Sequence, residues 1–187
     1  MNQPQLSKIR IYFTGVITLA MLALLSWQFF HDGVPSHHLL QSADYPAVSN
    51  WWGALLLPVL TWVLVGRVHN RILLEGRDTS TGYSTNVLVG FCLALLYGAG
   101  MSMAFATGYS EISSVMFPGI LGIALFFKIY REEYILGFIL SMSIVFGAVL
   151  PTLFGTIIAL ASAIVYHSVH YLLNRLKAFT NRAGEVN

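Results

Sequence analysis

Three histidines and one aspartate gather in a short stretch between two long apolar segments. They are His31, Asp32, His37 and His38, and a glycine and a proline lie between them. The glycine and proline would bend the chain so that His31 and His37 face one another, and imidazole and carboxylate groups are common metal ligands. The stretch is therefore a candidate divalent-metal site, although its spacing matches no established zinc motif. A pH-sensing loop and an ordinary interfacial loop are the alternative interpretations.

A second group of ionisable residues lies near the other ends of the apolar segments. The run Arg131-Glu132-Glu133 resembles the glutamate pair of glutamate-type intramembrane proteases, which place the pair and an arginine on a helix. Hydropathy puts the run between two apolar segments at the membrane interface, so we expect a solvated loop. His167 and His170 are three positions apart and share a helix face. We expect them to hydrogen-bond a neighbouring helix rather than to bind haem.

The composition restricts the class of protein that carries these residues. The chain has 187 residues, of which 56% are apolar and 10% are charged, whereas a soluble domain is about 25% charged. A net charge of +2 offers no concentrated basic face, which argues against a nucleic-acid partner. The single cysteine, Cys92, has no partner for an intrachain disulfide. We therefore expect residues 1–187 to form one integral membrane domain surrounded by lipid.

Six apolar segments predict an all-α fold, a polytopic membrane bundle of six transmembrane helices. One helix over 134–173 would be about 60 Å long, twice the hydrocarbon thickness, so this block must cross twice. Pro151 marks the expected turn because proline cannot continue a helix. The expected helices span residues 9–30, 48–66, 85–107, 113–129, 134–150 and 152–173, with an outer loop at 31–47 and a cytoplasmic tail at 174–187.

The basic residues predict the orientation. All ten fall in alternate connections: Lys8, Arg10, Arg67, Arg71, Arg77, Lys128, Arg131, Arg175, Lys177 and Arg182. Because basic residues are retained on the cytoplasmic side during insertion, both termini are expected in the cytoplasm. The expected location is the bacterial cytoplasmic membrane.

Small residues four positions apart form two stripes, and the second stripe ends in a histidine. They are Gly90, Ala94, Gly98, Ser102 and Ala106 in one segment, and Gly155, Ala159, Ala163 and His167 in the other. Such stripes let helices approach closely in lipid. We expect the third and sixth helices at the centre, where the stripes serve either packing or a narrow path.

The function expected from these features is a small-solute channel or transporter. No charged residue lies near the expected membrane midplane, which argues against a proton relay through it. One alternative is a membrane enzyme with a His/Asp site at the outer interface, to which Glu111 would contribute. The other is an accessory subunit that docks on a membrane-protein partner. A homo-oligomer is compatible with each of them.

Overall fold

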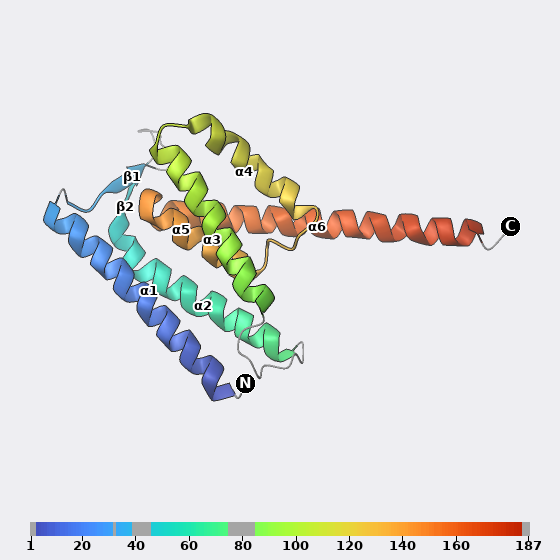
Figure 1. Cartoon of the computed structure of the whole chain (residues 1–187), viewed down its shortest axis with the longest axis horizontal. Coiled ribbons are helices and arrows are strands. Elements are labelled where there is room, and N and C mark those ends of the chain that lie inside the picture. Colours follow the sequence, from blue (N-terminus) through green and yellow to red (C-terminus); the bar gives the residue numbers. More distant parts are fainter. Residues whose placement is uncertain (1–2, 32, 39–45, 75–84, 185–187) are drawn as a thin grey trace.

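The computed structural model describes residues 3–31, 33–38, 46–74 and 85–184, and helices dominate them (Figure 1). The connection between the first two helices contains a short antiparallel strand pair and one turn of 3-10 helix. The elements are α1 (Gln3–His31), β1 (Ser36–His38), β2 (Ala47–Ser49), η2 (Asn50–Trp52), α2 (Gly53–Leu74), α3 (Thr85–Ala106), α4 (Ser110–Ala124), α5 (Glu132–Phe146) and α6 (Val149–Gly184). The all-helical class expected from the sequence is confirmed.

Four of the helices are long and apolar enough to cross a membrane. These spans are Leu6–His31, Asn50–Leu74, Thr85–Ala106 and Val149–Arg175. They mark the chain as an integral membrane protein. The other two helices, α4 and α5, have 15 residues each, which is about 22 Å of helix.

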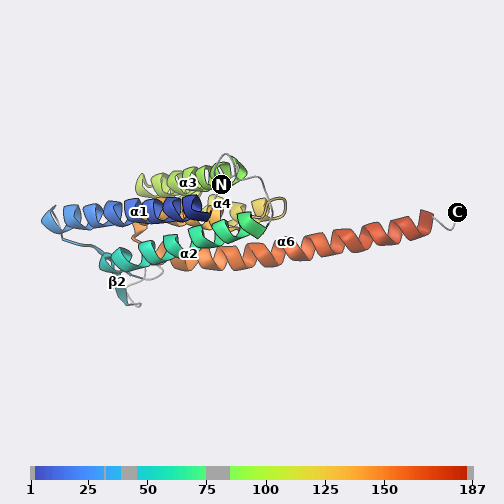
Figure 2. The ribbon, with the colours of Figure 1, turned by 90° about the horizontal axis from the view of Figure 1, so that it is seen from below.

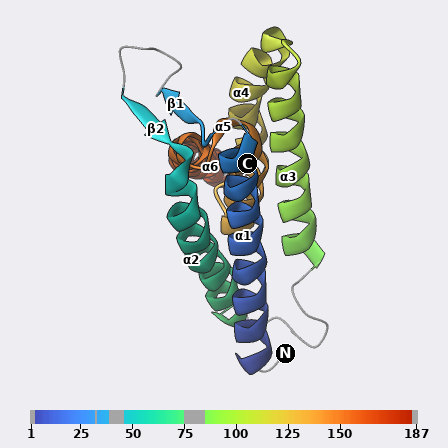
Figure 3. The same ribbon diagram turned by 90° about the vertical axis from the view of Figure 1, so that its left-hand side faces the viewer.

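The central helix is α5, whereas the sequence predicted the third and sixth helices there. It is buried along most of its length and packs against α2, α3 and α6. The closest pairing is with α3, where a Cβ on Gly137 would lie 2.5 Å from the carbonyl oxygen of Phe91. Gly90 of α3 packs against Tyr134 of α5 in the same interface. On the other side of the bundle, α1 lies along α2 (Figure 3).

The turn between α5 and α6 lies four residues before the expected position. Gly147 makes this turn with a φ of 69°, a conformation that glycine adopts without a steric cost. Pro151 lies in the first turn of α6, where a missing N–H costs little because the helix has no carbonyl four residues earlier to accept a hydrogen bond. The helix α6 then continues to Gly184, through the residues expected to form a tail, and projects beyond the other helices (Figures 1 and 2).

Candidate functional site

Asn50 forms the centre of a polar contact at one end of the bundle. Its side chain is 3% exposed. The amide Nδ2 donates to Oε1 of Gln28 at 3.1 Å, and Oδ1 accepts from the backbone N–H of Ala148 at 3.3 Å. Its own backbone N–H donates to the carbonyl of Pro35. Asn50 therefore joins the end of α1, the start of α2 and the turn between α5 and α6.

A cluster of five charged side chains lies at the opposite end of α2 and α5. The guanidinium of Arg71 donates to Glu132 at 2.5 Å and to Glu133 at 2.7 Å. Arg67 lies 3.4 Å from Glu132, and Arg131 lies 3.5 Å from Glu133. The side chain of Glu133 is only 4% exposed. The expectation of a solvated loop is wrong: both acids lie in the first turn of α5, and Arg71 binds them to α2.

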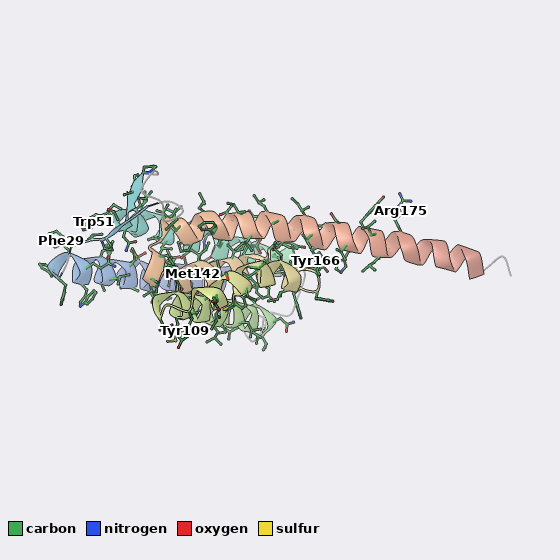
Figure 4. All side chains as sticks on the ribbon, turned by 90° about the horizontal axis from the view of Figure 1, so that it is seen from above. Phe29, Trp51, Tyr109, Met142, Tyr166 and Arg175 are labelled. Carbon is green, nitrogen blue, oxygen red and sulfur yellow. The ribbon has the colours of Figure 1, made fainter. Side chains whose placement is uncertain are left out.

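The two polar ends are separated by about the thickness of a bilayer core. Asn50 and Arg71 are 21 positions apart along the continuous span of η2 and α2, which is about 31 Å of helix, and the hydrocarbon core is about 30 Å. On α6, Tyr166 lies about 26 Å along the helix from Val149, the residue after Ala148. Figure 4 shows Phe29 and Trp51 together at one end of the molecule, with Tyr166 towards the other and Arg175 beyond it on α6.

An apolar cavity of about 330 Å³ lies between α3, α4, α5 and α6. Each helix supplies part of its wall, including Ala94 of α3, Ile120 of α4, Phe138 of α5 and Ala159 of α6. The cavity reaches the connection between α4 and α5, where Ile129 lines it. Its volume falls within the range of small-molecule sites. No Asp, Glu, Lys, Arg or His is among its lining residues.

The wall formed by α4 is held by fewer contacts than the others. This helix packs against α3 and α6, and the hydroxyl of Tyr97 on α3 donates to the carbonyl of Met116 at 2.6 Å. A Cβ on Gly122 would meet no atom within 4 Å. The helix α4 thus covers the cavity through few contacts, and Gly122 adds none of them.

Aromatic and basic side chains gather beyond the end of the cavity that Ile129 lines. They are Lys128 and Tyr130 from the connection between α4 and α5, and Tyr166, His167 and His170 from α6. The Lys128 ammonium lies 5.5 Å from the centre of the Tyr166 ring, and the Tyr130 ring lies 5.6 Å from that of His167. The His170 ring stacks on Tyr166, and its Nδ1 donates to the Tyr166 carbonyl at 2.9 Å. His170 therefore bonds its own helix, whereas a neighbouring helix was expected.

The candidate metal residues lie only partly within the part of the chain that the structure describes. His31 is exposed, stacks on Trp27 and donates from Nδ1 to its carbonyl at 2.9 Å. His37 and His38 lie on β1 and pair with β2 through the backbone, but their side chains and the whole of Asp32 lie outside the description. Among the described residues no three candidate ligands gather. The metal site remains a prediction.

Some residues of the two small-residue stripes contact α5, and some line the cavity. Gly90 and Gly98 of α3 and Gly155 of α6 contact α5. Ala94, Gly155 and Ala159 line the cavity. Ser102 is buried, Ala106 is exposed and Ala163 is half-buried. The larger lining residues carry no comparable signal in the sequence, apart from the alternation of apolar and polar residues at 127–130.

These features define an integral membrane protein with an apolar cavity between four of its helices. No protein-family model matches the chain, and neither a curated protein nor a solved structure does.

Proposed function

We propose that this protein binds the hydrocarbon part of a lipid-like molecule in the cavity between α3, α4, α5 and α6, as a lipid-binding transport protein. The observation that carries the proposal is a cavity of about 330 Å³ with no Asp, Glu, Lys, Arg or His among its described lining residues. A hydrated ion or a polar solute would lose water there and gain few hydrogen bonds, which is costly. An alkyl chain would lose no hydrogen bonds with water on entering the cavity. The solute of the expected transporter is therefore apolar.

The position of the cavity also favours a ligand from the bilayer. Its lining runs from Tyr97 and Phe138, near the middle of their helices, to Phe127 and Ile129 in the connection between α4 and α5. A chain of a lipid in one leaflet covers the same range of depth, from the interface to the midplane. The helix α4 packs against its neighbours through fewer contacts than the other walls do. A lipid would therefore enter the cavity by moving past α4.

We further propose six crossings of a bacterial cytoplasmic membrane, with both termini in the cytoplasm. Contacts support the number of crossings: Arg71 meets Glu132 at one level, and Asn50 meets Ala148 at the other. The helix α5 therefore reaches both levels although it is short. Because α2, α3 and α6 enclose α5, its length does not need to match the thickness of the bilayer. The bilayer constrains only segments that it contacts.

Thiol labelling tests the orientation. In a Cys92→Ser background, an impermeant maleimide applied to intact cells should label Thr107→Cys and leave Lys8→Cys unlabelled until the cells are opened. The two positions are exposed at opposite ends of the bundle. Labelling of Lys8→Cys in intact cells would overturn the proposed orientation.

Photo-crosslinking tests the lipid site. The full-length protein is reconstituted with a phospholipid that carries a diazirine near the end of one acyl chain, and labelled peptides are identified by mass spectrometry. Label is expected on the cavity walls of α3 and α6. Ala159→Phe should reduce it at least fivefold, because the ring fills the cavity that Ala159 lines.

The matched control is Ala20→Phe, which places the same ring at an exposed position on α1 and should leave cavity labelling unchanged. A second cavity-filling variant, Ala94→Phe on the facing wall, covers the case in which Ala159→Phe fails to fold. Labelling spread evenly over all lipid-facing helices, and equal in the cavity-filling variants and the control, would refute the proposed function.

A further inference from the structure

We propose that the molecule in the cavity is an anionic phospholipid, whose phosphate is bound by the cluster of Lys128, Tyr130, Tyr166, His167 and His170. This cluster is called the headgroup cluster below. The inference rests on the proposed function, because it assigns the polar end of the molecule whose chain occupies the cavity.

The connection between α4 and α5 contributes to both the cavity and the headgroup cluster. Phe127 and Ile129 line the cavity, whereas Lys128 lies against Tyr166 and Tyr130 lies against Tyr166 and His167. Alternate residues of this segment therefore serve two environments, one apolar and one polar. An amphiphile whose chain lies against the first would have its headgroup beside the second.

The order of groups along α6 matches the order of groups in a glycerophospholipid. Ala159 lines the cavity, and Tyr166 of the headgroup cluster is seven positions further on, about 10 Å along the helix. Ser162 lies between them, on the same face as Ala159. Its side chain is fully buried, and its hydroxyl has no hydrogen-bond partner among the described residues. Acyl chain and phosphate would then meet Ala159 and the headgroup cluster in turn, with the ester groups at the level of Ser162, which does not itself line the cavity.

The charge of the headgroup cluster favours an anion. No carboxylate of the described chain lies within ion-pair distance of Lys128, which is exposed. Glu132 and Glu133, the described carboxylates at this end of the bundle, are already paired with Arg67, Arg71 and Arg131. Lys128 is therefore a cation available to a phosphate, and the tyrosine hydroxyls and the His167 imidazole beside it supply further donors.

Two crosslinking lipids with identical diazirine-bearing chains test the inference. The full-length protein is reconstituted in phosphatidylcholine vesicles that contain a trace of either photoactivatable phosphatidylglycerol or photoactivatable phosphatidylcholine. We expect the anionic lipid to label the cavity at least fivefold more than the zwitterionic lipid. Lys128→Gln should remove most of this preference, and His167→Gln is a second variant in the same cluster.

The control is Lys8→Gln, which removes a cation from another exposed position and should keep the preference. Equal labelling by both lipids in the wild type, still abolished by Ala159→Phe, would overturn the headgroup assignment and leave the proposed function intact. Absence of cavity labelling by either lipid would overturn both the headgroup assignment and the proposed function.

Inorganic phosphate at millimolar concentration should not compete with the anionic lipid for labelling of the cavity. Full competition by phosphate would assign the cluster to a free anion and overturn the lipid assignment.

Discussion

The contact between α3 and α5 allows a sharp test of how the bundle is held together. Gly137 of α5 faces the backbone of α3, and a Cβ there would lie 2.5 Å from the carbonyl oxygen of Phe91 and 3.0 Å from the amide nitrogen of Leu95. Both are backbone atoms, so neither can rotate away. Since favourable heavy-atom contacts lie near 3.5 Å or more, Gly137→Ala would force the two helices apart by about 1 Å.

The expected magnitude follows from two opposing effects. Replacing a helical glycine by alanine stabilises a helix by roughly 0.5–1 kcal/mol, and overpacking costs about 1–3 kcal/mol, here at the upper end because backbone must move. Gly137→Ala should therefore lower the free energy of unfolding by about 2 kcal/mol. The matched control is Gly100→Ala on α3, where a Cβ meets no atom within 4 Å, so only the gain of roughly 0.5–1 kcal/mol applies.

Unfolding of the two purified variants by sodium dodecyl sulfate, followed by circular dichroism and tryptophan fluorescence, measures this difference. We expect Gly137→Ala to unfold at lower detergent fraction than the wild type, and Gly100→Ala at an equal or higher one. In a thermal experiment the difference of about 3 kcal/mol corresponds to roughly 6–12 °C for a chain of this size. Equal midpoints for the two variants would refute the close backbone approach of α3 and α5.

Three other substitutions test the polar contacts and the turn. Glu133→Gln should cost about 2 kcal/mol of unfolding free energy, because half-buried Arg71 loses one of its two carboxylate partners, whereas exposed Glu111→Gln should change it by less than about 0.5 kcal/mol. Asn50→Ala should cost about 1–3 kcal/mol because the Ala148 N–H loses its acceptor, and exposed Asn86→Ala should be near neutral. Gly147→Ala should cost roughly 1–2 kcal/mol because its φ is positive. Denaturation midpoints check all three, and a control as destabilised as its partner variant would contradict that assignment.

The sequence alone supports the all-helical membrane class because apolar length is a local property. The burial of Glu133 was not predictable in this way. Its partner Arg71 is 62 positions earlier in the chain. A carboxylate at the membrane interface is exposed to water unless a cation that is distant in the sequence packs over it. Pro151 was misleading for a related reason: proline ends a helix from within but is tolerated in the first turn, where the structure places it.

The cavity could not be located from the sequence because lipid and protein interior select the same residues. Ile120 and Phe138 line the cavity, yet their side chains are as apolar as those of Leu160, which is exposed on α6. In a bilayer the surroundings of a helix are as apolar as its neighbours, so hydropathy does not separate a lipid-facing side chain from a cavity wall. The small-residue stripes were visible, but Gly98 contacts α5 while Ala159 lines the cavity.

An experimental structure of the full-length chain in lipid nanodiscs that contain phosphatidylglycerol tests the central claim most directly. We expect elongated density between α3, α5 and α6, running from the level of Tyr97 past Ala159 and ending in a compact feature beside Lys128. A bundle in which α4 closes onto α5 and leaves no space at Ala159 would contradict the account.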